Sequence, residues 1–378
     1  MGAASQPEVD LPLSASEWHT YQDHIPPLLK SIEVQGGTMQ GRFFDYLIRY
    51  GAAAPMTTPL NDCAQQPLLV PRILPTVSDA KSEEFVLSDN RKLGVAYFGA
   101  ATGAPVFYLH GYPGCRLSGA FFDAPGKKLG ARIIAVDRPG IGNSSPQPGR
   151  VLLDLANDVR ELAEQLNFRS YGIIGVSGGG PYALACAHSL PVENLKGVSI
   201  IGGMGPIELG TKGMSWGNWF TFTGLIYFPF IIRWLQNKVV RLLDKMTNEK
   251  LVEAVQGKLS DKSASWLGSD LMILKDPESF STMLDLYREH FKQGVDGYME
   301  DGYVLTRDWG FRLEDIPASI PIQLWYSRKD INVPLHMGEA IAARLRYPPD
   351  FYVEEDETHL NLVLKYSADA LERLLEKM

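Results

Sequence analysis

Gly175-Val176-Ser177-Gly178-Gly179 is the stretch that decides the fold of this 378-residue chain. It follows the apolar run 171–174, which predicts a short buried strand. It precedes residues 180–187, where an initial glycine and a proline in the first turn predict a helix. Ser177 therefore lies on a very sharp turn between a strand and a helix. The glycines around it remove Cβ atoms that would clash with one another and with the start of the helix.

A turn of this kind gives Ser177 a chemical role that a serine within a regular element lacks. Its hydroxyl is pushed into the open at the carboxyl edge of the sheet, beside the N-terminus of a helix. Unpaired N–H groups and a positive field at that helix end can stabilise an oxyanion. The arrangement is that of the nucleophile elbow of serine hydrolases, provided that the chain also supplies a base and an acid.

The chain on either side of this turn alternates between strands and helices. The predicted strands are at 85–87, 93–98, 106–109, 132–136, 171–174, 198–201, 322–325 and 351–353, and the first two form a hairpin. The predicted helices are at 117–129, 151–166, 180–190 and 336–345, and a last one begins near residue 359 and runs to the C-terminus. Such alternation predicts an α/β fold with a mostly parallel sheet and helices on both faces.

The first part of the chain does not share this pattern. Residues 1–80 contain scattered prolines and little periodicity, which predicts an N-terminal extension. Two short helices are expected within it, at 25–34 and 41–50, followed by a proline-punctuated tether at 67–75. We expect the extension to pack on the core or to be partly mobile; the alternative is that it helps to cover the active site or makes a subunit contact.

A helical lid is predicted at 205–315, between the core segments 81–204 and 316–378. Because it separates two strands of one parallel sheet, it should lie over the carboxyl edge, where ligands bind. Most of its aromatic rings are expected to form its own core, and two or three to line an apolar substrate pocket. We predict that role for Trp219, Phe222 and Tyr227. The rings of this segment are Trp216, Trp219, Phe220, Phe222, Tyr227, Phe228, Phe230 and Trp234.

The composition limits the classes of partner. A hydrophobic content of 45% and a charged content of 21% are typical of a soluble globular protein. The net charge of −8 and the pI near 5.5 argue against nucleic acid and anionic membranes as general partners. The longest apolar stretch, 219–232, is interrupted by Gly224 and Pro229 and is too short to span a bilayer.

The cysteines and the N-terminal residues indicate the cellular compartment of the protein. The three cysteines, Cys63, Cys115 and Cys186, form no close pair and no metal-ligand spacing, which favours a reducing environment. Residues 1–10 have no basic start and no apolar core, so no secretory signal is predicted. We therefore expect a cytoplasmic protein without a metal site.

A second turn, after the third predicted strand, adds backbone donors. The loop is His110-Gly111-Tyr112-Pro113-Gly114, and its glycines let the backbone approach a reacting carbonyl. The N–H of Tyr112 is predicted to join that of Gly178 in an oxyanion hole, since Pro113 cannot donate.

Three further residues near these turns are interpreted as structural. His110 ends a strand, and such a histidine commonly holds a loop by hydrogen bonds rather than acting in catalysis. Asp137 and Arg138 follow the fourth predicted strand and are expected to fix the glycine-rich loop after it.

An acid and a base follow the last two predicted strands. Asp330 lies where an acid can fix the tautomer of a histidine on a neighbouring loop, and His359 lies on that loop. The chain order Ser177, Asp330, His359 is the order expected for an elbow serine. If Asp330 is not the acid, Asp356 and Glu357 are the next candidates. The remaining histidines are less well placed: His19, His24, His188, His290 and His336.

Together these motifs resemble the α/β-hydrolase superfamily, in the branch with a helical cap after the sixth strand. The resemblance covers residues 84–378 and implies an eight-stranded sheet. It departs from the common pattern at Ser327, where a glycine is more usual. Epoxide hydrolases and haloalkane dehalogenases of this branch carry Asp at the elbow, so Ser177 argues against both. The motifs are His-Gly-Tyr-Pro-Gly (110–114), Asp-Arg-Pro-Gly-Ile-Gly (137–142), Gly-Val-Ser-Gly-Gly-Gly (175–180), Asp-Ile-Asn-Val-Pro (330–334) and Glu-Thr-His-Leu (357–360).

The resemblance implies Ser177 as nucleophile, His359 as base and then acid, and Asp330 as the orienting carboxylate. The expected reaction is two-step acyl transfer on a small apolar ester, thioester or lactone, with an amide left open and no cofactor required. The alternatives are a lyase or acyltransferase with the same triad, or a non-hydrolytic ligand receptor on this fold. A homo-oligomer is also left open.

Overall fold

A computed structural model describes residues 80–256 and 275–378, together with Leu74 and Val77. The predicted extension therefore falls outside the described residues, apart from Leu74, Val77 and Ala80. Leu74 and Val77 are both buried, and Val77 belongs to the main hydrophobic core. The helices predicted at 25–34 and 41–50 also lie outside the described residues.

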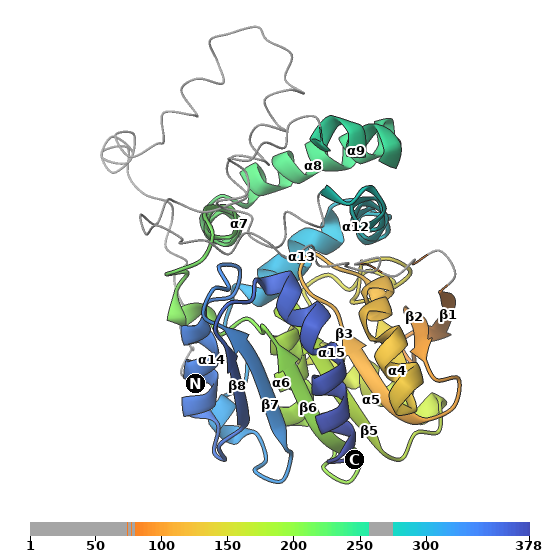
Figure 1. Cartoon of the computed structure of the whole chain (residues 1–378), viewed down its shortest axis with the longest axis vertical. Coiled ribbons are helices and arrows are strands. Elements are labelled where there is room, and N and C mark those ends of the chain that lie inside the picture. Colours follow the sequence, from red (N-terminus) through yellow and green to blue (C-terminus); the bar gives the residue numbers. More distant parts are fainter. Residues whose placement is uncertain (1–73, 75–76, 78–79, 257–274) are drawn as a thin grey trace, which may run out of the picture. The chain divides into compact units, whose positions relative to one another are not determined.

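An eight-stranded sheet forms the centre of the fold, as predicted (Figure 1). Its strands lie in the order β1-β2-β4-β3-β5-β6-β7-β8; β2 is antiparallel to β1 and β4, and all later pairs are parallel. The predicted hairpin is β1 and β2, and Asn90 in its turn has a φ of 68°. The strands are β1 Lys81–Val86, β2 Lys92–Gly99, β3 Ala104–Leu109, β4 Ala131–Val136, β5 Tyr171–Val176, β6 Leu195–Ile201, β7 Ile322–Ser327 and β8 Asp350–Glu354.

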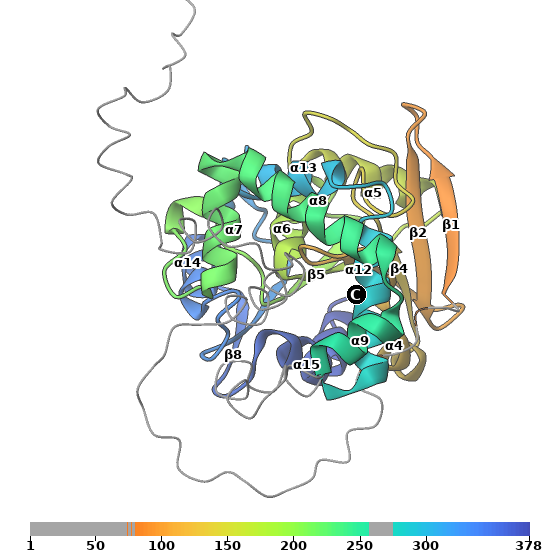
Figure 2. The ribbon, with the colours of Figure 1, turned by 90° about the horizontal axis from the view of Figure 1, so that it is seen from above.

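Helices cover both faces of the sheet (Figures 1 and 2). One face carries α4 (Asp123–Leu129) and α15 (His359–Leu375), which contact each other across it. The opposite face carries α5 (Asp154–Gln165), α6 (Gly180–Ser189) and α14 (Leu335–Arg344). Because both faces are covered, every residue of β5 and of β7 is buried. Burial on both faces explains why β5 is a continuous apolar run rather than an alternating one.

One predicted helix is divided in two. The sequence pattern predicts a single helix over 117–129, but the structure has a 3-10 helix, η1 (Arg116–Phe122), followed by α4. A Cβ on Gly119 would lie 2.6 Å from Ala135 Cβ and 2.8 Å from the Phe98 ring. The missing side chain thus lets η1 lie directly on β2 and β4.

A set of helices is inserted between β6 and β7 and lies beyond one end of the sheet (Figure 1). They fall within the predicted lid and are called the helical insertion below. None of the described helices, in the insertion or elsewhere, is long and apolar enough to cross a membrane. The helices of the insertion are α7 Trp216–Tyr227, α8 Pro229–Lys245, α9 Asn248–Gln256, α12 Pro277–His290 and α13 Asp296–Leu305.

The expectation that most aromatic rings of the insertion form its core is wrong. Among the eight rings, Phe222 is buried at 5% exposure, whereas six have large exposed areas: Trp216, Trp219, Tyr227, Phe228, Phe230 and Trp234. The inward side of α7 is formed by Phe222, Gly224 and Leu225. A helix that lies on a core buries the side chains of one side only. In α7, which is apolar on all sides, the remaining rings therefore stay exposed.

Candidate active site

Ser177 lies on the predicted sharp turn between β5 and the helical segment that leads into α6. Its φ is +53°, a left-handed conformation that an ordinary L-residue adopts at a cost of roughly 1–2 kcal/mol. The glycines of the turn are required by close packing. A Cβ on Gly175 would lie 2.6 Å from the carbonyl oxygen of Gly179, and one on Gly179 would lie 2.1 Å from that of Leu109. The turn thus brings the elbow against the end of β3.

The two predicted oxyanion donors lie side by side. A Cβ on Gly178 would be 3.1 Å from the backbone nitrogen of Tyr112, so these two stretches of backbone touch. A Cβ on Gly111 would be 3.3 Å from Ser177 Cβ and 3.8 Å from its Oγ. The structure therefore brings the loop after β3 close to the serine hydroxyl.

Asp330 and His359 are joined directly. Asp330 Oδ2 lies 2.6 Å from His359 Nδ1, while Oδ1 accepts hydrogen bonds from the backbone N–H groups of Asn332 (2.8 Å) and Val333 (2.9 Å). The Asp330 side chain is fully buried, and that of His359 is 15% exposed. Because a carboxylate can only accept, Nδ1 carries the proton and Nε2 is the basic nitrogen of the ring.

The backbone after β6 connects the His–Asp pair with the elbow. A Cβ on Gly202, whose φ is +54°, would lie 3.0 Å from His359 Cε1 and 3.4 Å from Asp330 Oδ2. Two residues later, the N–H of Met204 donates to the carbonyl oxygen of Ser177 at 3.1 Å. One short stretch of chain thus contacts the imidazole at one end and the serine at the other.

The two alternative acids are engaged elsewhere. Asp356 pairs with Lys329 at 2.6 Å and its side chain is 76% exposed, while Glu357 pairs with Lys365. Neither takes the place beside Nδ1 of His359, which Asp330 occupies.

Ser327 has a role that the sequence did not indicate. It ends β7, is fully buried, and its Oγ donates to the carbonyl oxygen of Glu357 at 2.7 Å. Since Asp330 and His359 follow Ser327 and Glu357 closely, this bond joins the loop of the acid to the loop of the base.

His110 holds the loop after β3, as expected. It is fully buried; its Nδ1 donates to Gly111 O at 2.9 Å, and its Nε2 accepts from Arg138 N at 3.3 Å. Burial and the nearby Arg138 charge lower the pKa of His110 well below its ordinary value. It therefore stays neutral, in a tautomer that both bonds fix.

Asp137 and Arg138 fix their loops, also as expected. Asp137 accepts from the backbone N–H groups of Arg116 (2.7 Å) and Asn143 (2.9 Å). The Arg138 guanidinium donates to the backbone oxygens of His110 and Gly111. The strand-end loops around the site are therefore held by buried charged groups.

Asp301, in α13, is a buried residue that sequence reasoning missed. It is fully buried and accepts from Arg138 (2.6 Å), Arg150 (2.9 Å) and Tyr182 (2.7 Å). Burial alone raises the pKa of Asp301, but the two arginines outweigh burial and hold it below its ordinary value. Residues 138 and 301 are too far apart in sequence for any local pattern to pair them.

The side chain of Tyr112 lies against the insertion. Its ring stacks on Tyr298 with centroids 4.7 Å apart, and its hydroxyl donates to the Tyr298 carbonyl oxygen at 3.3 Å. Phe222 lies 6.0 Å from the same ring. Burial raises the pKa of the Tyr112 phenol well above its ordinary value, so the phenol is neutral.

Of the three predicted substrate contacts, only Phe222 is placed at this site by the contacts of the described residues. Trp219 is 40% exposed and its ring is tilted against that of Trp216, and Tyr227 is 68% exposed beside Phe228. For Trp219 and Tyr227, contact with a substrate stays a prediction.

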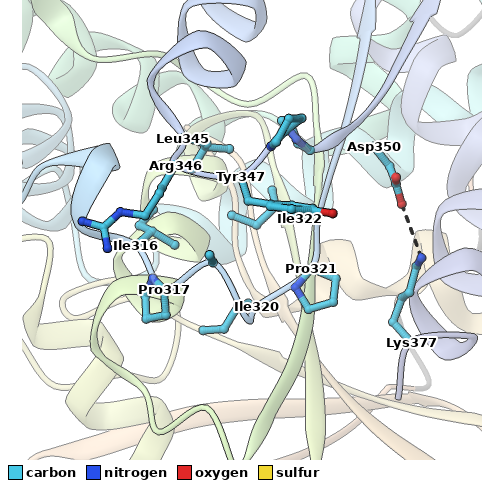
Figure 3. A pocket seen from close by; sticks show the side chains of 13 residues that line it. Ile316, Pro317, Ile320, Pro321, Ile322, Leu345, Arg346, Tyr347, Asp350 and Lys377 are labelled. Carbon is cyan, nitrogen blue, oxygen red and sulfur yellow. Dashed lines mark ion pairs between the residues drawn. The ribbon is translucent and has the colours of Figure 1, made fainter.

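A separate hollow lies at the other end of the sheet, at the starts of β7 and β8 (Figure 3). It has a volume of about 180 Å³ and is lined by apolar and proline side chains, among them Ile316, Pro317 and Tyr347. The ion pair between Lys377 and Asp350, 3.7 Å apart, lies on one side of it. None of the predicted catalytic residues lines it. Within the described ranges, no group of three His, Cys, Asp or Glu side chains could hold a metal ion.

Comparison with known proteins finds sequence relatives over part of the chain. The chain is 30% identical over 126 residues to a proline iminopeptidase from Xylella fastidiosa, over 32% of this chain and 39% of that protein. The chain thus matches well under half the length of this relative.

Solved structures show the fold over a longer range. An esterase from Exiguobacterium antarcticum matches with a TM-score of 0.51 and 18% identity, over 78% of this chain and 98% of that one. An enol-lactonase from Burkholderia xenovorans matches with a TM-score of 0.54 and 15% identity, over 78% of this chain and all of that one. The family profile described as alpha/beta hydrolase fold matches residues 104–366. From the sheet, the elbow and this match, we conclude that the chain belongs to the alpha/beta hydrolase fold family.

Proposed function

We propose that this chain is a serine hydrolase that cleaves a small apolar ester, thioester or lactone through an acyl-enzyme on Ser177. The observation that carries the proposal is the 2.6 Å contact between the buried Asp330 and His359, which the backbone at 202–204 links to a serine held at a positive φ. A carboxylate, an imidazole and a strained serine at one sheet edge form the set of groups that acyl transfer needs.

The first half of the reaction forms the acyl-enzyme. Nε2 of His359 takes the proton of Ser177 Oγ as this oxygen attacks the carbonyl carbon. The negative charge that develops on the carbonyl oxygen is accepted by the N–H groups of Tyr112 and Gly178. The imidazolium then gives its proton to the leaving oxygen or sulfur, and the carbon–leaving-group bond breaks.

The second half returns the free enzyme. Water gives a proton to His359 while its oxygen attacks the acyl carbon, and the same two N–H groups hold the new oxyanion. Collapse releases the acid, and Ser177 Oγ recovers its proton from the imidazolium. The Asp330 carboxylate stabilises the imidazolium.

The surroundings of Tyr112 support an apolar acyl or alcohol group. Tyr112 and Gly178 are bordered on the insertion side by Phe222 and Leu305; a Cβ on Gly178 would lie 3.3 Å from Leu305 Cδ1. We propose Phe222 as the residue of α7 that contacts substrate.

A second candidate is cleavage of an amide next to proline, because a sequence relative is a proline iminopeptidase. A substrate with a free cationic amino group needs an unpaired carboxylate near the nucleophile. In the described part of the insertion, Asp301 is taken up by Arg138 and Arg150, and Glu289 lies 2.7 Å from Arg116. These two carboxylates are thus already paired with arginines, which supports the ester as the first candidate.

A fluorophosphonate probe tests the nucleophile. Wild-type protein should be labelled, and Ser177→Ala should not. Ser189→Ala, which changes a serine at the far end of the same α6 helix, is the matched control and should be labelled like wild type. Equal labelling of Ser177→Ala and wild type would overturn the proposal.

A substrate panel then separates the candidate reactions. Chromogenic esters of rising acyl length should be turned over faster than the p-nitroanilide of proline. If the anilide is cleaved faster, the amide is the substrate class. Labelled protein that turns over no ester, thioester or lactone would favour a same-triad lyase, an acyltransferase or a ligand receptor instead.

A further inference from the structure

The corner between α7 and α8 carries an unusual group of exposed apolar side chains. Ile226 and Phe228 are 42% and 41% exposed, and Tyr227 and Phe230 are each 68% exposed. Trp234, one helical turn after Phe230, is 47% exposed. We call these five residues the aromatic corner. Large apolar side chains gathered on one exposed segment mark a surface that contacts something other than water.

The packing of the two helices keeps these side chains outside. A Cβ on Gly224 would lie 2.5 Å from Ile232 Cδ1, so α7 and α8 meet closely there. Leu225, on the same side of α7, reaches toward α13, where a Cβ on Gly302 would lie 2.6 Å from its Cδ1. The inward contacts are thus made by other residues, and the aromatic corner is left free of the described core.

The charge of these helices is opposite to that of the whole protein. The chain has a net charge of −8, but α7 and α8 together carry four basic side chains and one acidic, a net charge of +3. Lys238 Nζ lies 5.3 Å over the Trp234 ring, so cation and aromatic ring are adjacent. The charged residues of this pair of helices are Arg233, Lys238, Arg241, Asp244 and Lys245.

We propose that the aromatic corner and the basic side of α8 bind the surface of a lipid bilayer that contains anionic phospholipid. Exposed Tyr, Trp and Phe side chains favour the head-group level of a bilayer, and Lys and Arg beside them are attracted to anionic lipid phosphates. The helices lie on the surface rather than crossing it. The overall negative charge disfavours membranes in general, so the contact is confined to this corner.

The position of α7 connects this surface with the active-site loops. The N–H of Ser215 donates to Ile331 O at 2.6 Å, and Asn218 Nδ2 donates to the side-chain oxygen of Asn332 at 3.1 Å. Both acceptors belong to the loop that carries Asp330. A bilayer bound at the aromatic corner therefore lies against the helix that adjoins the acid loop. Bilayer binding at this corner does not require the proposed chemistry at Ser177.

Vesicle flotation with the full-length chain tests the proposal. The protein should float with vesicles of equal parts phosphatidylcholine and phosphatidylserine, and floating should weaken as salt is added. Phe230→Ser should lower the partition coefficient about tenfold or more, because the apolar ring no longer leaves water on binding. Tyr347→Ser is the matched control: Tyr347 is 69% exposed and lines the hollow at the other end of the sheet, so the variant should float like wild type.

A second variant separates charge from apolar contact. Lys238→Gln with Arg241→Gln should lower partitioning about fivefold for each charge on the mixed vesicles and much less on pure phosphatidylcholine. Ser177→Ala should float like wild type. Absence of flotation with the mixed vesicles, or equal loss for Phe230→Ser and Tyr347→Ser, would overturn the proposal. So would a dimer in sedimentation that Phe230→Ser abolishes while vesicles bind neither form.

Discussion

The pairing of Asp330 with His359 decides how the imidazole is oriented. The carboxylate accepts from Nδ1 and from two backbone N–H groups, so its own position is fixed from three directions. Fixing the proton on Nδ1 leaves Nε2 as the base, and an amide in place of the carboxylate would favour the wrong tautomer.

Asp330→Asn should therefore fold normally and lose about 10⁴-fold in turnover number on an ester substrate. The control is Asp356→Asn, which changes an exposed aspartate on the neighbouring loop and should keep nearly full activity. Steady-state kinetics on both variants checks this. A larger loss in Asp356→Asn than in Asp330→Asn would show that the acid is assigned wrongly.

At the scale of elements, the ends of β7 and β8 are held together by one buried hydroxyl. The bond from Ser327 Oγ to the Glu357 carbonyl oxygen fixes the loop of the acid relative to that of the base. A glycine, the commoner residue here in the resembling family, lacks this bond.

Ser327→Ala should lower the turnover number about fivefold and leave KM nearly unchanged, since a buried hydrogen bond contributes about 1 kcal/mol. Ser144→Ala is the matched control, because Ser144 also donates from a buried hydroxyl to a backbone oxygen, at 2.8 Å to Asp137. Both variants should lose similar stability in chemical denaturation. Equal kinetic loss in the two variants would mean that Ser327 acts only through stability.

At the scale of the whole described molecule, Asp301 joins the insertion to the sheet. Its carboxylate lies between Arg138, after β4, and Arg150, before α5, all three being buried. Removing one charge from such a group leaves buried guanidinium groups without a counter-charge, which costs about 3–5 kcal/mol. Asp301→Asn should therefore be strongly destabilised. Asp296→Asn, in the exposed first turn of the same α13 helix, should change stability by less than about 1 kcal/mol.

The stability difference between wild type and Asp301→Asn depends on pH, and the direction in which the pKa of Asp301 is shifted determines how. The pKa of Asp301 is lower in the folded protein than in the unfolded chain. The contribution of the Asp301 charge to the free energy of unfolding is complete above the ordinary carboxyl pKa of about 4. It is lost as the pH falls through the pKa of Asp301 in the folded protein. Denaturation curves of wild type and Asp301→Asn should thus differ equally at neutral and mildly acid pH, and converge only in strong acid. Convergence near neutral pH would contradict this assignment.

The sequence predicted what local pattern determines. Ser177 and its glycines form a continuous turn, and Asp330 and His359 follow strands that apolar runs mark clearly. Asp301 could not be predicted, because its partners lie far away in the sequence and buried charges follow no period. The aromatic rings of α7 and α8 were placed wrongly for a different reason: hydrophobic content shows that a helix is apolar, but not which side of it faces the core.

The Asp301 cluster also determines which parts of the insertion can be exchanged in protein engineering. Segments between α7 and α9 could be exchanged with those of other hydrolases to alter substrate range, because α7 is joined to the core by hydrogen bonds of Ser215 and Asn218 to a single loop, the one that carries Asp330. A transplanted α13 would need a carboxylate at the position of Asp301 to suit the two resident arginines. It would also need a ring like that of Tyr298 to support Tyr112. Exchange of the whole insertion as one cassette would therefore succeed only in scaffolds that already contain both arginines.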